Sequence, residues 1–408
     1  MKRFLLFFIL LAPALAKAED ACPKVRAPRD ILDCALRLHP EIRAAQAAVL
    51  AAQEGVSSSG QRPNPEVTSQ IVRGGPADRR FTYGELNFTH IFELGGKRSA
   101  RIARGRANLE QSQANLLAVR EEAFMGTWLV LHRLRQIRDR LALIDEALTV
   151  YGRVVKQYAD RPALSPELTV SRRIFELAQS DLALKHAALE IQADANARAV
   201  ERAIGRNLAA DEPLPEKRRE WPETEDNAHD QAAEGGALAR AQAGVEEARS
   251  RQDSARSLAW PEFRAGPTVE RQTGSGSFSA YGLNFGLGLP LYQRNGAGRI
   301  QADREAEHAR LTLTAVDHEQ RDQRESALYA YRRSVTALTA LPGEQAVNAG
   351  HVEIERLFAR GVVSAPLLLE AHRQRLDLAA SQDERELAAI ENYARLQALR
   401  GRLTEGAP

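Results

Sequence analysis

The chain has 408 residues, with 56 basic and 54 acidic side chains and a formal net charge of +2. Lys2, Arg3 and Lys17 lie in the first 18 residues, which contain no acidic residue, so the remainder is close to neutral. With 6% aromatic residues and no sustained basic domain, the composition gives little support for nucleic-acid binding. We find no HExxH motif, phosphate-binding glycine loop or serine-nucleophile motif, and therefore expect no catalytic residues, no cofactor and no enzyme.

The N-terminus has the three parts of a secretory signal peptide. Met1-Lys2-Arg3 is followed by an apolar run from Phe4 to Leu11 and by the small-x-small sequence Ala16-Lys17-Ala18. An uncleaved membrane anchor is less favoured, because the apolar run is about half of the ~20 residues that span a bilayer. We predict a signal peptide over residues 1–18 and a mature chain that begins near Glu19.

Cys22 and Cys34 lie close together near the start of the mature chain, in a compartment where thiols tend to oxidise. A disulfide is the favoured interpretation. Two free thiols, or lipid attachment at Cys22, are the alternatives. The residues before Cys22, Glu19-Asp20-Ala21, lack the apolar residue that a lipid-attachment motif has three positions before the cysteine.

The sequence repeats itself once, at a separation of roughly 200 residues, which indicates a duplicated module rather than a solenoid. The matched segments are 45–49 with 241–245, 65–66 with 261–262, 83–88 with 281–285, and 101–102 with 299–300. We assign residues 19–205 to a first module and 237–408 to a second. The intervening segment 206–236, which contains Pro213, Pro215 and Pro222, is predicted to be a linker.

Each module is expected to begin with a helix, over about 30–60 and 235–258, and to continue with two strands. We predict strands at about 65–73 and 81–93 in the first module, and at about 261–272 and 278–291 in the second. The last strand alternates most clearly, with apolar side chains from Tyr281 to Leu291 at every second residue and Asn284, Gly286 and Gly288 between them. This alternation is typical of a membrane barrel and also of a soluble β-sandwich; the small residues opposite the apolar row favour the barrel.

Four strands cannot close a membrane barrel, because exposed sheet edges in lipid leave backbone groups unpaired. The chain must therefore form an oligomer if it spans a membrane, and three copies would supply twelve strands.

A long helical hairpin follows each strand pair, over 97–205 and 296–402. The rising helices are expected to run continuously from Lys97 to about Tyr158 and from Ala297 to about Arg360, each roughly 90 to 95 Å long. Gly95 and Gly96 lie where a strand must become a helix and are interpreted as turn residues. The basic side chains that follow are expected to form a solvated face: Lys97, Arg98, Arg101, Arg104 and Arg106.

Over nearly the whole mature chain this pattern resembles the TolC-type outer membrane factors. The resemblance is carried by Ala35-Leu36-Arg37-Leu38-His39-Pro40-Glu41-Ile42 and, most specifically, by the segment from Phe358 to Ala371. Two strand-to-helix junctions, 92–98 and 289–296, resemble the branch that serves heavy-metal resistance-nodulation-division pumps.

The resemblance implies a mainly α-helical fold with a β-barrel part. Three copies would form a 12-stranded outer-membrane β-barrel continuous with a 12-helix periplasmic α-barrel. The implied function is a passive exit duct in the outer membrane of a Gram-negative bacterium, with heavy-metal cations as the cargo and drugs or organic compounds as the alternative. The implied partners are two further copies of the chain, outer-membrane lipid, a periplasmic adaptor and an inner-membrane pump.

The resemblance also assigns roles at the helix turns. The adaptor-contact tip would include Gly361, Val362, Val363, Ser364 and Ser165. The first turn, Arg161 to Pro166, departs from the second, which weakens their equivalence. Glu167 and Glu370 are the nearest candidates for an acidic periplasmic gate.

We predict no metal site. His351 with Glu355, and His186 with Glu190, have the i,i+4 spacing that places two side chains on one helix face, but no further ligand is evident from the sequence. Two other functional classes remain open: a periplasmic coiled-coil adaptor and a periplasmic metal-dependent hydrolase. The adaptor predicts one hairpin flanked by compact β domains, and the hydrolase predicts a ligand cluster.

Overall fold

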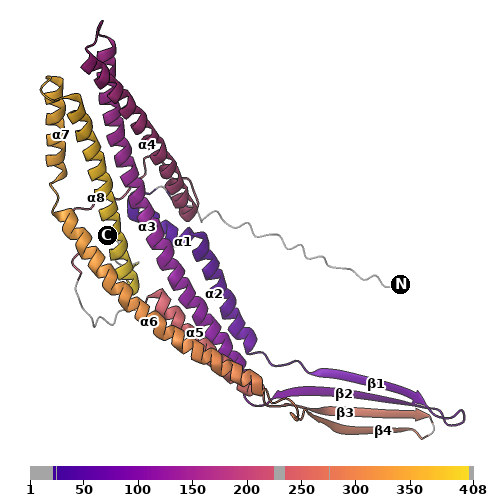
Figure 1. The fold of residues 1–408 in the computed structure, drawn as a ribbon. Helices are drawn as coiled ribbons and strands as arrows, with labels where there is room; N and C mark the ends of the chain where they lie inside the picture. The colour runs from indigo at the N-terminus through magenta and orange to yellow at the C-terminus, as the bar shows by residue number, and fades with distance from the viewer. Residues whose placement is uncertain (1–21, 24, 225–234, 275, 404–408) are drawn as a thin grey trace, which may run out of the picture. The chain divides into compact units, whose positions relative to one another are not determined.

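The computed structural model describes residues 22–23, 25–224, 235–274 and 276–403 (Figure 1). The predicted signal peptide and the predicted mature N-terminus at Glu19 lie outside the described residues. The elements, in chain order, are α1 (Pro28–Leu38), α2 (Pro40–Ser59), β1 (Glu66–Gly74), β2 (Phe81–Glu93), α3 (Lys97–Ala159), α4 (Pro166–Ile204), α5 (Gly236–Ser257), β3 (Glu262–Gly274), β4 (Phe278–Leu287), α6 (Gly296–Thr339), α7 (Glu344–Ala359) and α8 (Ala365–Leu399).

The same order of elements occurs twice. The first half has α1 and α2, the hairpin β1–β2, then α3 and α4; the second has α5, the hairpin β3–β4, then α6 to α8. Helices dominate, and the four strands form one antiparallel sheet. The predicted fold class, mainly α-helical with a β-hairpin in each half, is confirmed.

Three predicted elements differ from the structure, and a proline lies at each difference. The helix expected to run from Ala297 to about Arg360 ends at Thr339 and resumes at Glu344, on either side of Pro342. The first helix likewise divides between Leu38 and Pro40. Strand β4 ends at Leu287, before Pro290, although the apolar alternation continues to Leu291. Proline lacks the backbone N–H that hydrogen bonding requires in both a helix and a sheet, and its ring clashes with the preceding turn inside a helix.

The chain divides into two compact units. The turn unit comprises the residues up to Pro40, Gly126–Arg218 and Pro342–Asp383; the sheet unit comprises Glu41–Met125, Arg219–Leu341 and the residues from Glu384. The turn unit has a continuous apolar core, contributed by α3, α4 and α8, that includes Ile137, Tyr151, Phe175 and Leu368. A smaller core in the sheet unit joins α6 to α8 through Tyr331 and Leu396.

In the segment predicted to be a linker, residues 206–224 contain no helix or strand, and α5 begins at its last residue, Gly236. Trp221 and Pro222 of this segment pack in the sheet unit. Trp221 lies beside Tyr331, with ring centroids 6.3 Å apart, and the Tyr331 hydroxyl donates a hydrogen bond to the Pro222 carbonyl at 2.6 Å. These contacts hold Trp221 and Pro222 against α6.

Candidate functional site

The four strands pair in the order β1-β2-β3-β4, and every pair is antiparallel. Strands β2 and β3 lie at the centre of the sheet (Figure 1), with Leu86 opposite Val269 and Phe92 opposite Phe263. The two halves of the chain therefore meet in this central pair. Among the described residues, β1 and β4 each have one neighbour, so both edges of the sheet are unpaired.

One face of the sheet is apolar and exposed. Directly opposed residues in an antiparallel sheet share a face, so the register assigns each side chain. The exposed apolar side chains on this face are Val67, Ile71, Leu86, Phe88, Phe92, Val269, Tyr281, Leu283, Phe285 and Leu287. Its polar members include His90 and Arg271, which lie toward opposite ends of the strands. A band of exposed apolar side chains of this size marks a surface covered by lipid or by another chain.

The opposite face of the sheet is mainly polar, with apolar exceptions at Val72, Phe81, Ile91, Phe278 and Ala280. Hydrogen bonds and ion pairs connect its side chains, including Asn87 with Glu85 at 2.8 Å and Arg264 with Glu66 at 3.2 Å. Its polar residues are Glu66, Thr68, Gln70, Tyr83, Glu85, Asn87, Thr89, Glu93, Glu262, Arg264, Thr268, Glu270, Gln272 and Asn284. One lipid-facing and one water-facing side is the pattern of a membrane barrel strand.

The strands contain 9, 13, 13 and 10 residues. A tilted strand needs about 9 to 11 residues to cross the hydrocarbon core. Each strand of the sheet is therefore long enough to cross it. Within the described residues, no helix combines the length and apolar character of a membrane span.

Two glycines connect β2 to α3 through left-handed backbone, Gly95 with φ +67° and Gly96 with φ +75°. A methyl group at Gly95 would overlap the ring of Trp260, whereas one at Gly96 would meet only the Ser99 hydroxyl, at 3.2 Å. Gly95 therefore combines a backbone requirement with a steric one, as its predicted role as a turn residue requires.

We expect Gly95→Ala to lower the stability of the sheet unit by about 2 kcal/mol or more, because it adds left-handed strain to a steric overlap with Trp260. Gly96→Ala is the matched control, since it carries the strain with little overlap, and should cost less. The apparent melting temperature of the detergent-extracted protein at a fixed scan rate measures both. Equal losses in the two variants would show that Trp260 plays no part.

The basic residues that open α3 are not simply solvated. Lys97 pairs with Glu262 at 3.3 Å, Arg98 donates to the Gly60 carbonyl at 2.9 Å, and Arg101 pairs with Glu93 and reaches the Gln61 carbonyl. Lys97 is largely buried, which differs from the predicted solvated face, whereas Arg98 is exposed as predicted and Arg101 is half-buried. They fasten the start of α3 to the end of α2 and to the adjoining strands.

The turn between α7 and α8 contains four of the predicted tip residues. Gly361 has φ +76°, and the amide of Val362 donates to the Leu357 carbonyl at 3.0 Å, so glycine ends α7 in the usual left-handed cap. The Ser364 carbonyl accepts hydrogen bonds from the first turn of α8. Val362 is exposed, at 70%. The turn thus presents an apolar side chain on a rigid backbone.

The turn between α3 and α4 is capped differently. Ser165 is the N-cap of α4, and its hydroxyl accepts a hydrogen bond from the Leu168 amide at 3.3 Å, with Pro166 in the first turn. Both turns lie in the turn unit. Phe175 of α4 contacts Phe358 of α7, with ring centroids 6.2 Å apart, so the two helical hairpins share a core near their turns.

The two gate candidates have different surroundings. Glu370 accepts hydrogen bonds from Arg373 and Gln374, at 2.7 to 2.9 Å, and these bonds hold the pKa of its carboxyl below its usual value. The charge of Arg373 offsets that of Glu370. Glu167 is exposed in the first turn of α4, where the helix dipole favours an acid.

Helix α4 carries an exposed apolar stripe with a seven-residue repeat. Its members are Val170, Leu177, Leu184 and Ile191, exposed by 57% to 74%. A seven-residue apolar repeat is the pattern of a helix that packs lengthwise against another helix. The described residues leave this stripe uncovered, and its spacing suits packing against another helix.

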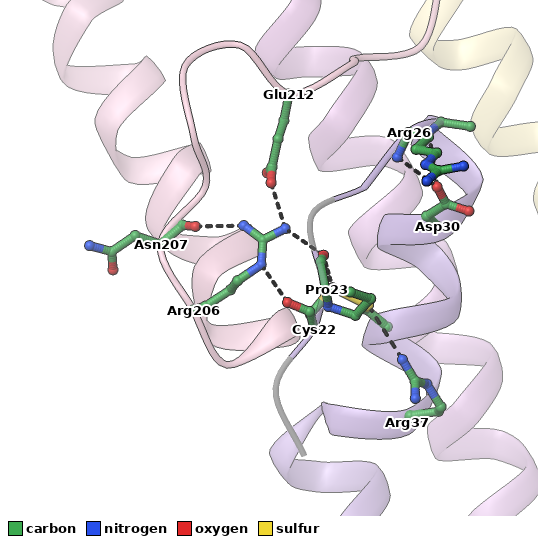
Figure 2. The surroundings of a disulfide bond; sticks show 10 residues. Cys22, Pro23, Arg26, Asp30, Arg37, Arg206, Asn207 and Glu212 are labelled. Carbon is green, nitrogen blue, oxygen red and sulfur yellow. Dashed lines mark hydrogen bonds and ion pairs between the residues drawn. A yellow bond between two sulfur atoms is a disulfide. The ribbon is translucent and has the colours of Figure 1, made fainter. Parts of the chain in front are cut away.

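Cys22 and Cys34 form a disulfide, with Cα atoms 5.6 Å apart, that joins the N-terminal segment to α1 (Figure 2). Arg206, just beyond α4, donates to the Cys22 carbonyl at 2.9 Å and to the Pro23 carbonyl at 3.2 Å, and it also pairs with the buried Glu212. Figure 2 shows the guanidinium between these acceptors. The disulfide occupies the sulfur that lipid attachment at Cys22 would require.

Replacing both cysteines with serine should loosen the N-terminal segment and cost at most ~3 kcal/mol, because the closed loop is short. Limited proteolysis of the extracted protein should then cut before α1 faster than in the wild type, whereas cleavage within α4 should be unchanged. Labelling of both thiols in untreated wild-type protein from the cell envelope would contradict the disulfide.

The two histidine pairs singled out by spacing differ sharply. His186 lies between Asp145 and Glu190, which contact different ring nitrogens at 3.2 and 3.5 Å, and both carboxylates are more than 60% exposed. His351 is buried, and the structure adds His372 of α8 to its pair with Glu355. The sequence analysis missed His372, which lies on a different helix. His351 and His372 are almost equally far from Gly361 along the chain, and such positions meet in an antiparallel hairpin.

Comparison with solved structures identifies outer-membrane channels of the same fold. The CmeC outer membrane channel of Campylobacter jejuni matches with a TM-score of 0.70 and 12% identity, over 92% of this chain and 85% of that chain. The open state of the MtrE outer membrane channel of Neisseria gonorrhoeae matches with a TM-score of 0.70 and 17% identity, over 92% and 90%. CusC, whose structures concern folding and transmembrane channel formation, matches with a TM-score of 0.67 and 13% identity, over 91% of both chains.

No protein-family model matches the chain, and neither does any curated protein. The structural similarity is extensive at low identity, so it establishes the fold. The chain has the fold of the TolC-type outer membrane channels.

Proposed function

We propose that the chain is the protomer of a trimeric outer-membrane exit duct. The observation that carries this proposal is the two-faced sheet, with an apolar exposed side, a polar side and two unpaired edges. Such a sheet is stable in lipid only if its edges pair with other copies, and three copies supply twelve strands. The apolar stripe on α4 supports the same proposal, since a helix of another copy would cover it.

In this proposal the two helix turns face the periplasm and contact an adaptor that connects the duct to an inner-membrane pump. The exposed Val362 and the rigid caps at Gly361, Ser364 and Ser165 suit a docking surface. Glu167 is the better candidate for an acidic gate, because Arg373 offsets the charge of Glu370. Three copies of Glu167 around a symmetry axis would concentrate negative potential.

The cargo we propose is a heavy-metal cation, on the resemblance of the two strand-to-helix junctions, 92–98 and 289–296, to the metal branch of the family. Drug or organic-compound export is the alternative. A duct has no need to bind its cargo tightly, since tight binding slows release. A coiled-coil adaptor is a weaker candidate, because this chain has two hairpins and a single sheet shared by both halves.

Fractionation and cross-linking test the duct itself. The protein should appear in the outer-membrane fraction, and a lysine-reactive cross-linker should yield a species of three chains. Recovery of only a soluble periplasmic monomer would contradict the proposal.

Deletion of the gene tests the cargo. Growth should be measured on copper, silver, cobalt, zinc, cadmium and nickel, and on a panel of organic drugs. Sensitivity to metals that the wild-type gene reverses supports metal export, and sensitivity to drugs alone would overturn it.

A further inference from the structure

Two histidines and a glutamate converge between α7 and α8. His351 and Glu355 lie one turn apart on α7, and His372 extends from α8 toward both. The carboxylate atom Oε1 of Glu355 is 3.2 Å from Nε2 of His351 and 3.3 Å from Nε2 of His372. The two imidazole rings meet edge to face, with centroids 4.5 Å apart.

These atoms are buried and lack hydrogen-bond partners. The His351 and His372 side chains are 4% and 3% exposed. Within the described chain, Nε2 of each histidine and Oε1 of Glu355 make no hydrogen bond, in spite of their proximity. Buried polar atoms are nearly always satisfied, so three unsatisfied atoms directed at one point indicate a missing bonding partner.

The contact that Nδ1 of His372 makes indicates the tautomer of the neutral ring. Nδ1 lies 3.1 Å from the Leu368 carbonyl, which can only accept, so Nδ1 carries the proton. In the neutral ring, Nε2 then presents a lone pair toward Glu355. A histidine that donates one N–H to a backbone carbonyl and directs the other nitrogen at a shared point has the arrangement of a metal ligand.

The two distances from Glu355 to the histidines are close to those of a metal site. In tetrahedral zinc coordination the ligand atoms lie about 3.4 Å apart. The three candidate atoms all lie within 4.8 Å of one another. A second carboxylate, Glu146 of α3, is 3.9 Å from Nε2 of His351, and its other oxygen pairs with Arg375 at 2.9 Å.

The donor types select the cation. Imidazole nitrogen with carboxylate oxygen suits zinc and similar borderline divalent cations, whereas magnesium and calcium prefer oxygen ligands alone. Cys22 and Cys34, the two cysteines of the chain, are joined to each other, so neither offers a thiolate.

We propose that His351, Glu355 and His372 form a binding site for Zn²⁺ or a similar borderline divalent cation, with Glu146 in reach as a fourth ligand. The bound ion would link α7, α8 and α3 close to the α7–α8 turn. This is a resident structural site, and it does not depend on whether the chain exports metals.

The experiment is a zinc titration of the full-length, untagged protein after removal of metal with a chelator. Competition with a chromophoric chelator gives the affinity and stoichiometry, which should be one zinc per chain. His351→Gln and His372→Gln should each weaken binding by about 100-fold or more, because each removes a direct ligand. His186→Gln, at the exposed pair without convergent ligands, should leave binding unchanged and serves as the matched control.

Glu355→Gln keeps the shape of the side chain and removes its charge, so the variant should still fold. It should bind zinc more weakly than the wild type while its circular dichroism spectrum stays that of the wild type. X-ray absorption of the zinc-loaded wild type should show two imidazole ligands. A shell of oxygen atoms alone, or equal zinc affinity in the wild type and the folded His351→Gln and His372→Gln variants, would overturn the proposal.

Discussion

Leu283→Arg should remove the protein from the outer membrane. Leu283 lies near the middle of the β3–β4 pairing, opposite Pro267, on the exposed apolar face of the sheet. An arginine facing lipid at the bilayer centre costs about 2 to 4 kcal/mol. In a trimer the cost is incurred three times, about 6 to 12 kcal/mol, which approaches the whole stability of an ordinary domain.

The matched control for this variant is Asn284→Arg, one residue along the same strand and on the polar face. Its guanidinium would reach water and the acidic side chains of that face, so the protein should remain in the outer membrane. Fractionation followed by immunoblotting measures both variants. If Leu283→Arg fractionated with the outer membrane as well as Asn284→Arg does, the apolar face would not be the lipid-facing one.

Phe175→Ala should destabilise the turn unit by about 3 to 5 kcal/mol, because it opens a cavity that cannot collapse fully. Phe175 is fully buried, and its ring contacts Tyr151 of α3 at 5.3 Å and Phe358 of α7 at 6.2 Å, measured between centroids. It thereby joins the two hairpins near their turns. The proposed adaptor surface should lose rigidity together with this core.

Phe175→Leu is the graded control, since it retains an apolar side chain of similar reach and should cost about 1 kcal/mol. Many large proteins unfold irreversibly, so the comparison uses hydrogen exchange and the apparent melting temperature at one scan rate. Amides of α4 and α7 should exchange fastest in Phe175→Ala. Equal protection in the two variants would contradict a shared core at this position.

The sequence predicted the sheet well because its signal is local. Alternation over a strand and left-handed glycines at a junction depend on neighbouring residues, and both were readable around Tyr281 and Gly95. The alternation also misled, since it continued past Leu287 to Leu291. Periodicity reports which face a side chain would occupy and gives no information on where backbone pairing stops; Pro290 was the better signal.

Local sequence patterns could not predict the candidate metal cluster. The i,i+4 spacing identified His351 with Glu355 and also His186 with Glu190, and nothing in the periodicity separated the two pairs. What separates them is His372, brought in by the turn at Gly361, and the burial that the hairpin core provides. The ion pairs of Lys97 and Arg101 were missed for a related reason, because their partners lie on other elements.

The central β2–β3 pair has a consequence for symmetry. It joins the first half of the chain to the second, and in the proposed trimer β4 of one copy would meet β1 of the next in the same antiparallel sense. The ring would then contain six similar seams: one β2–β3 seam inside each of the three chains, and three β4–β1 seams between neighbouring chains. The fused halves would behave as six related subunits, and the seam already present in each monomer would be a template for the seam that assembly has to make.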